Sequence, residues 1–154
     1  MIIYTLHRKQ FLPISVEEAW AFFSSPLNLP QITPPYMNFK IVSNFKKDET
    51  IKEGTVIEYR VSPLFKIPLK WITIISKAEA PYCFIDKQEK GPYSFWEHTH
   101  TFKEAPGGIV MTDEVNYSLP FGRLGILAHN LIVKKQLEHV FEYRKEILKG
   151  LLKK

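Results

Sequence analysis

The sequence predicts an α+β fold in which a meander of antiparallel strands is followed by one long helix. Three observations lead to this expectation. Apolar and polar residues alternate in several short segments within residues 37–119, as in half-buried strands. A capped helix precedes these segments, and an amphipathic helical pattern runs over residues 125–152. Strands and helices that are segregated along the chain are typical of α+β domains.

Length and composition describe one ordinary globular domain, residues 1–154. The chain is 45% hydrophobic and 14% aromatic, which suits a bulky core or an aromatic-lined cavity. A net charge of +5 favours anionic partners weakly, and the single cysteine, Cys83, excludes an intramolecular disulfide. No signal peptide is evident, and no apolar run approaches the ~20 residues of a membrane span. We therefore expect a cytoplasmic protein without stable membrane insertion.

The first two expected elements are a strand and a capped helix. Residues 4–11, YTLHRKQF, are predicted to form the strand. Ser15 stands at an N-cap position with Glu18 three residues later, which is the capping-box pattern, and apolar residues follow at helical spacing. Pro26 ends this helix, and the proline-rich stretch after it has room only for a short helical turn at residues 29–32.

Six more short strands are expected next, which makes seven with the first. Turn-forming stretches separate them: KDETIKEG, SPLFKIP, AP, KGP and APGG. The second of these strands places Tyr59 among its inward-facing apolar residues. The predicted strands cover residues 37–41, 55–61, 69–76, 83–88, 91–102 and 108–119.

The last predicted element is one long helix over residues 125–152. At 100° per residue, its apolar side chains gather on one face, and His129 and Arg144 lie on that face or at its edge. A basic amphipathic helix can lie on a membrane surface, but the acidic residues of this one and its place after a sheet favour packing on that sheet. The apolar positions are Leu137, Val140, Phe141, Leu148 and Leu151.

The stretch GPYSFWEHTHTF, residues 91–102, carries the strongest functional signal. In a strand, Trp96, His98, His100 and Phe102 share one face, because side chains alternate with a period of two. The opposite face becomes polar where the strand should be fully formed. We therefore expect the face with the two histidines to point inward.

Two hairpin registers predict what lies beside this face. A two- or four-residue loop at APGG places His100 opposite Asp113 and Trp96 opposite Tyr117. A three-residue loop at KGP places Asp86 beside Trp96, and by the same register Phe84 lies beside His98. Such a wall combines aromatic rings, two histidines and two carboxylates. It is too polar for a dry core and typical of a ligand cavity.

The order of the predicted elements resembles the helix-grip fold of the START-related superfamily, also called SRPBCC, over nearly the whole chain. More narrowly, PYCFIDKQEKGPYSFWEHTHTF, DEVNYSLPFG and LGILAH...QLEHVFEYR resemble a bacterial subfamily of ligand-binding SRPBCC proteins that are similar to polyketide cyclases and dehydrases. The resemblance implies a curved seven-stranded antiparallel sheet wrapped around the long C-terminal helix. One or two short helices would follow the first strand, and a cavity would lie between sheet and helix.

The same resemblance implies functional positions. The polar and aromatic positions of the subfamily match Trp96, His98, His100, Asp113, Tyr117 and Arg144 of this sequence. One stretch departs from the pollen-allergen branch of the superfamily: residues 44–54, NFKKDETIKEG, hold a single glycine, so a phosphate-cradling loop is not expected.

Three interpretations of the histidines remain open from the residues alone. They are metal ligands with Asp113 as a third, a hydrogen-bonded His100–Asp113 pair on the cavity wall, or purely structural groups. We favour the cavity-wall pair, and we expect no metal and no cofactor, because only Asp113 is placed to join the two imidazoles. Arg144 is expected to pair internally with Asp86 or Asp113, since an unpaired buried charge is costly.

The predicted function is the binding of a small, mostly hydrophobic ligand of lipid, polyketide or aromatic-acid type. The alternative is a cofactor-free cyclase, dehydratase or hydrolase in which a cavity histidine is the general acid or base. Nucleic-acid binding is disfavoured because the aromatic residues face inward, and both a monomer and a homodimer remain possible. Residues 29–36 and 119–125 would flank the cavity mouth. The predicted cavity residues are Tyr59, Phe84, Asp86, Trp96, His98, His100, Phe102, Asp113, Tyr117, His129 and Arg144.

Overall fold

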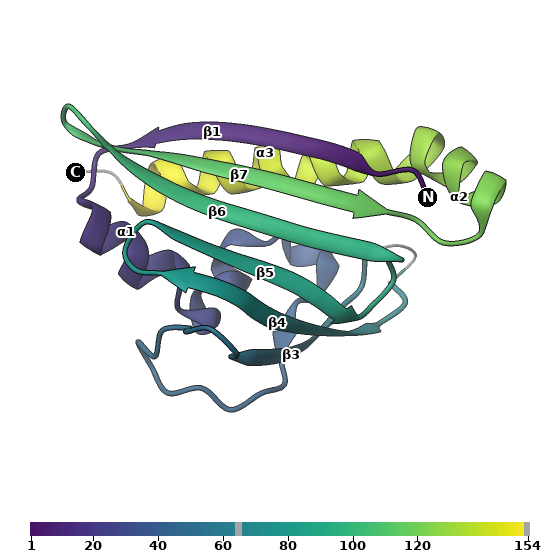
Figure 1. Ribbon diagram of the computed structural model, residues 1–154, viewed down its shortest axis with the longest axis horizontal. Coiled ribbons are helices and arrows are strands. Elements are labelled where there is room, and N and C mark those ends of the chain that lie inside the picture. The colour runs from purple at the N-terminus through teal and green to yellow at the C-terminus, as the bar shows by residue number, and fades with distance from the viewer. Residues whose placement is uncertain (64–65, 153–154) are drawn as a thin grey trace.

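The computed structural model describes residues 1–63 and 66–152. It confirms the predicted α+β architecture: one curved antiparallel sheet of seven strands, with the long C-terminal helix across one face (Figure 1). The strand order is β1-β7-β6-β5-β4-β3-β2, so only β1 pairs out of sequence, with β7. The strands are β1 (Tyr4–Leu12), β2 (Lys40–Ile41), β3 (Val56–Val61), β4 (Leu69–Glu79), β5 (Cys83–Lys90), β6 (Phe95–Ala105) and β7 (Gly108–Ser118).

The first helix, α1 (Val16–Phe23), begins as the sequence predicts. The Glu18 backbone N–H donates to Ser15 Oγ at 3.1 Å, and the Ser15 N–H donates to the Glu18 carboxylate at 3.2 Å. These two bonds are the complete capping box, and they satisfy backbone donors that the first helical turn leaves free. The helix packs its apolar side chains into the core at one end of the sheet.

The proline-rich stretch after α1 forms two 3₁₀ helices, η1 (Pro26–Ile32) and η2 (Pro35–Met37). The strand predicted over residues 37–41 is wrong for most of its length, because β2 consists of only two residues. Met37 ends η2, and Asn38 adopts a left-handed conformation with φ of 48°, which an extended strand does not tolerate. The alternation of apolar residues there reflects burial without strand pairing.

Of the two predicted hairpin registers, one is confirmed and one is wrong. In the β6–β7 pair, His100 lies opposite Asp113, as predicted. In the β5–β6 pair, Phe84 lies opposite His100 and Asp86 opposite His98, a shift of two residues from the predicted register. The cause is the connection: the Gln88 side chain binds both the backbone N–H and the carbonyl of Tyr93, so residues 91–94 stay outside the ladder.

The C-terminal helical region begins three residues earlier than predicted and has three parts. They are α2 (Gly122–Ala128), a π-helical turn η3 (His129–Val133) and α3 (Lys134–Leu151). Leu137, Phe141 and Leu148 are buried against the sheet, as the amphipathic pattern predicts. The helix therefore packs on the sheet, and α2 extends past the end of β7 (Figure 1).

Candidate functional site

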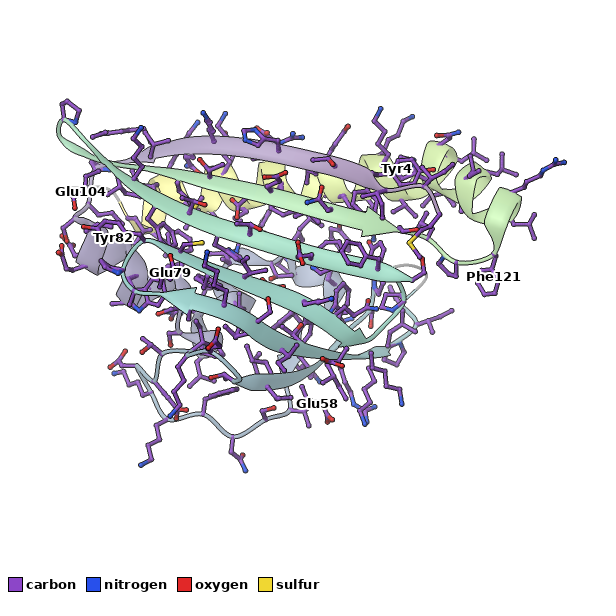
Figure 2. The ribbon with its side chains drawn as sticks, in the orientation of Figure 1. Tyr4, Glu58, Glu79, Tyr82, Glu104 and Phe121 are labelled. Carbon is purple, nitrogen blue, oxygen red and sulfur yellow. The ribbon has the colours of Figure 1, made fainter. Side chains whose placement is uncertain are left out.

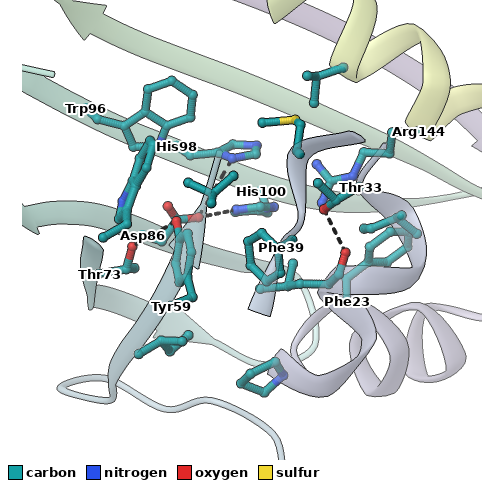
Figure 3. A pocket seen from close by; sticks show the side chains of 18 of the residues that line it. Phe23, Thr33, Phe39, Tyr59, Thr73, Asp86, Trp96, His98, His100 and Arg144 are labelled. Atoms are coloured by element: carbon teal, nitrogen blue, oxygen red, sulfur yellow. Dashed lines mark hydrogen bonds and ion pairs between the residues drawn. The ribbon is translucent and has the colours of Figure 1, made fainter. Parts of the chain in front are cut away.

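A cavity of about 180 Å³ lies between the sheet and α3, beside the 3₁₀ segment η1. Strands β3 to β6 supply the largest share of its wall, α3 and η1 supply further parts, and the other lining residues come from the end of α1, η2 and the connecting segments. Most of the side chains that line it are apolar or aromatic. Asp86, His98, His100 and Arg144 add a polar group on one side, and the first three point toward one another (Figure 3). The fold thus places a compact polar cluster in an otherwise apolar space.

Seven of the eleven predicted cavity residues line this cavity: six lie on strands that alternate as the sequence indicates, and Arg144 lies on the inner face of α3. Of the two segments expected to flank the cavity mouth, residues 29–36 contribute Leu29, Ile32 and Thr33 to the lining, whereas none of the residues 119–125 lines the cavity. The seven residues are Tyr59, Phe84, Asp86, Trp96, His98, His100 and Arg144.

Phe102 and Asp113 do not line the cavity, which corrects the prediction. Phe102 lies further along β6, where its ring stacks on Phe23 of α1 at a centroid distance of 5.4 Å and closes the core. Asp113 lies on β7. Its carboxylate binds His98 and Arg144, two side chains that do line the cavity.

Tyr117 and His129 also lie outside the cavity. The Tyr117 hydroxyl and His129 Nε2 are hydrogen-bonded at 2.7 Å, and the His129 ring stacks on Tyr4 at 3.5 Å. The helix reaches this position about two turns before its first cavity residue, Gln136, so His129 contacts β1 and β7 and does not reach the ligand space. Its role in the structure is to fix the start of the long helix to the sheet.

The two histidines each bind a different carboxylate. His98 Nε2 donates to Asp113 Oδ1 at 2.8 Å, and His100 Nε2 donates to Asp86 Oδ2 at 2.6 Å. The predicted His100–Asp113 hydrogen bond is therefore wrong, although the backbone register that suggested it is right. The side chains reach diagonally across the strands, which backbone pairing alone does not reveal.

The same four side chains make a second, longer set of contacts. His98 Nδ1 lies 3.8 Å from Asp86 Oδ2, and His100 Nδ1 lies 3.6 Å from Asp113 Oδ1. The imidazole rings stack at a centroid distance of 3.6 Å. Each carboxylate oxygen thus lies between both histidines, and the four side chains form a closed network (Figure 3 shows its cavity side).

Arg144 completes this network from α3. Only 8% of the residue is exposed, and its Nη1 donates to Asp113 Oδ1 at 3.4 Å. The predicted internal pairing is confirmed, and an arginine that extends into solvent is excluded. The guanidinium also lies over the Phe141 ring at 5.6 Å, and within residues 1–63 and 66–152 its buried Nε finds no hydrogen-bond partner.

Burial and the neighbouring charges shift the pKa values of three groups in the network. Burial alone would raise the pKa of Asp113, but the Arg144 charge and the His98 hydrogen bond outweigh burial and hold that pKa well below its usual range. The pKa of Asp86 is lowered for the same kind of reason: burial opposes ionisation, and the His100 hydrogen bond with the nearby positive charges outweighs it. Burial lowers the pKa of His100 to about 4, so this imidazole is neutral.

Asp86, His98 and His100 could in principle hold a metal, since each offers a ligand atom and these atoms lie within 4.8 Å of one another. Two imidazoles and one carboxylate are a common donor set for divalent transition metals. The third group is Asp86, whereas the sequence suggested Asp113. In the structure, however, His100 Nε2 and Asp86 Oδ2 are bonded directly to each other, and a metal would have to displace that bond.

We expect protein purified without a histidine tag to carry far less than one zinc, iron or manganese per chain. The ligand atoms of His100 and Asp86 satisfy each other, so a metal gains less than it would in a preformed open site. Elemental analysis by mass spectrometry measures this content. Near-stoichiometric metal that is lost in both His98→Ala and His100→Ala would contradict the expectation.

Sequence reasoning missed Trp71, Thr73 and Tyr93, which also line the cavity. The signal was present in β4, because Trp71 and Thr73 are two residues apart and share the inward face. The Trp71 ring packs edge-on against Trp96 at 5.3 Å, and its buried Nε1 has no hydrogen-bond partner among the described residues. This indole N–H is therefore a free donor in the cavity wall.

Comparisons with known proteins identify the fold. No family model and no curated protein matches this sequence. Among solved structures, a protein of Chromobacterium violaceum is similar with a TM-score of 0.74 and 10% identity, and 97% of each chain is covered. A START superfamily protein of Mycobacterium smegmatis has a TM-score of 0.67 and 13% identity, with 96% of each chain covered. A protein of Rhizobium leguminosarum has a TM-score of 0.68 and 14% identity, covering 97% of this chain and 96% of its own.

These similarities confirm the fold that was predicted from the sequence. The chain has a START-like, SRPBCC-type helix-grip fold, in which a curved antiparallel sheet holds a long C-terminal helix. At identities of this size the likeness concerns the fold alone, and function has to be argued from the cavity itself.

Proposed function

We propose that this protein is a cytoplasmic binding protein for one small, mostly hydrophobic ligand, held in the cavity between sheet and α3. The observation that carries the proposal is the cavity's composition: apolar and aromatic walls with polar groups gathered at one place. Sites for small molecules share this design, because the apolar surface supplies affinity and a few polar groups fix the orientation. The START-like fold supports the proposal by analogy.

The size of the cavity limits the ligand. Its volume of about 180 Å³ is smaller than the ~300–1,000 Å³ usual for drug-sized ligands, which favours a single ring system or a short chain over an intact phospholipid. Trp71 and Trp96 meet edge to face, and Tyr59 stacks near Trp71 at 5.7 Å. Rings arranged in this way favour a flat, aromatic or polyketide-like ligand.

The polar wall limits the ligand's chemistry. Asp86 and Asp113 are ionised and His100 is neutral, so the network places two carboxylates beside the Arg144 guanidinium. A ligand carboxylate would therefore meet repulsion, whereas a hydroxyl can donate to this network and accept from the free Trp71 N–H. We infer a neutral ligand that bears a hydroxyl or carbonyl group, in preference to an aromatic acid.

A small, neutral, environment-sensitive dye with a carbonyl group, such as prodan, tests the cavity directly. We expect saturable binding to the native protein, and at least about tenfold weaker binding by Trp96→Ala, because a large aromatic wall is lost. Trp20→Phe is the matched control, since Trp20 packs on Phe84 from α1 and does not line the cavity. Fluorescence titration measures the three affinities. Absence of saturable binding, or equal affinity in Trp96→Ala and the native protein, would contradict the proposal.

The Asp86–His100 hydrogen bond of 2.6 Å favours one alternative, a cofactor-free cyclase, dehydratase or hydrolase. The Asp86 carboxylate fixes the tautomer of His100, and because both residues line the cavity, this pair could exchange a proton with a bound ligand. Incubation with hydroxylated aromatic and polyketide compounds, followed by mass spectrometry, separates turnover from retention. Product that forms with the native protein and is absent with His100→Gln would establish the enzyme.

A further inference from the structure

One end of the protein exposes an apolar surface that the cavity does not explain. We call it the α2 patch and define it by Phe121, Leu124, Leu127 and Leu131. Phe121 is 81% exposed and Leu124 72%, and more than half of the other two is exposed as well. Ile2 and Ile3, at the start of the chain, are also exposed, and Ile2 lines a shallow pocket together with residues of α2. Figure 2 labels Phe121 at this end of the molecule.

The geometry of α2 explains why these side chains face outward. Leu124, Leu127 and Leu131 are three and four residues apart, so they share one helical face. Gly125 forms the opposite, inward face: it is buried, and a Cβ there would lie 2.2 Å from the carbonyl oxygen of Pro120. Because α2 extends past the end of β7 (Figure 1), its leucine side chains remain exposed.

The charged residues that lie next to the α2 patch along the chain are all positive. Residues 115–137 contain no aspartate or glutamate, whereas Arg123, Lys134 and Lys135 are exposed beside the patch. Exposed leucine and phenylalanine flanked by cations suit the boundary between anionic headgroups and acyl chains. A symmetric dimer through the same patch would bring equal cations together, which opposes self-association. In the described part of the chain, no helix has the length and apolar character of a membrane span.

We propose that the α2 patch docks the protein reversibly on an anionic lipid surface. The leucine face enters the headgroup boundary, and Arg123 with Lys134 binds the phosphate groups. The proposal rests on this surface alone and is independent of what the cavity holds.

Sedimentation with lipid vesicles tests the proposal. We expect the protein to bind vesicles of equimolar phosphatidylcholine and phosphatidylglycerol, to bind phosphatidylcholine alone much more weakly, and to be released by salt. Leu124→Gln combined with Leu131→Gln should weaken binding at least about tenfold, because both side chains leave the apolar boundary. Arg123→Gln should weaken binding to the mixed vesicles about fivefold, which corresponds to one cation near an anionic surface.

Leu151→Gln is the matched control, because this leucine is also exposed but lies at the other end of the long helix. It should bind the mixed vesicles like the native protein. The proposal is overturned if the native protein does not bind the mixed vesicles, or if Leu151→Gln loses as much binding as the double variant. It is also overturned if light scattering shows a dimer that Leu124→Gln dissociates, since the patch is then a contact between two copies. Circular dichroism checks that each variant is folded.

Discussion

Replacing Arg144 by alanine is expected to lower the free energy of unfolding by about 3–5 kcal/mol. The guanidinium is buried and bonded to Asp113, whose carboxylate lies within the histidine network. Without Arg144, that carboxylate stays buried with the histidines as its remaining partners, and two acidic groups then repel each other across the network. Chemical denaturation monitored by circular dichroism measures the change.

Lys149→Ala is the control for this prediction. Lys149 also forms an ion pair on α3, with Glu146 at 3.1 Å, but both side chains are mostly exposed. An exposed pair contributes little, so the loss should stay below about 0.5 kcal/mol. Adding Asp113→Asn to Arg144→Ala should restore part of the lost stability, because it removes the stranded charge. Equal, small losses in Arg144→Ala and Lys149→Ala would show that the buried pair contributes no more than a surface pair.

The second large effect is a loss of stability between about pH 6.5 and pH 4, which we attribute to His100. Its pKa is about 4 in the folded protein and 6.5 when unperturbed, so the unfolded chain takes up this proton first as the pH falls. The contribution of His100 is complete above pH 6.5 and is lost toward pH 4, by roughly 3 kcal/mol in total. Asp86 and Asp113 also have lowered pKa values, and their contribution is lost below the ordinary aspartate pKa of 3.8, in a more acidic range.

His100→Gln isolates this contribution, because glutamine is neutral throughout the range. The free energy of unfolding of this variant should vary less with pH between 6.5 and 4 than that of the native protein. His7→Gln, at an exposed position of β1, should keep the native pH dependence. If His100→Gln and the native protein lose stability in parallel over this range, His100 is not the group responsible.

The sequence alone was sufficient for the fold, because each element carried its own local signal. The capping box at Ser15, the period of two in the strands and the apolar face of the last helix are all set by neighbouring residues. The strand at residues 37–41 was the exception. There the same alternation of apolar residues occurs in a 3₁₀ turn, and local pattern cannot distinguish the two.

The candidate site could be predicted only in part. The inward face of Trp96, His98 and His100 follows from strand alternation, and the structure places all three in the cavity wall. The inward position of Trp71 could be predicted from its strand in the same way, but Trp71 lies outside residues 91–102, on which the site prediction was based. His129 shows the opposite error: helix periodicity placed it correctly on the inner side, yet that side meets β1 and β7 at this point instead of the cavity.

Only the tertiary structure determines which carboxylate forms a hydrogen bond with which histidine. Strand pairing is a relation between backbones, whereas a hydrogen bond depends on side-chain directions and on the exact offset between strands. The Gln88–Tyr93 bonds shift the β5–β6 register by two residues, which brings Asp86 to the histidines. Asp113 then binds His98 and accepts a hydrogen bond from Arg144, which lies 31 residues further along the chain on α3. Such a network joins four elements, β5, β6, β7 and α3, and their mutual position exists only once the sheet has closed around the helix.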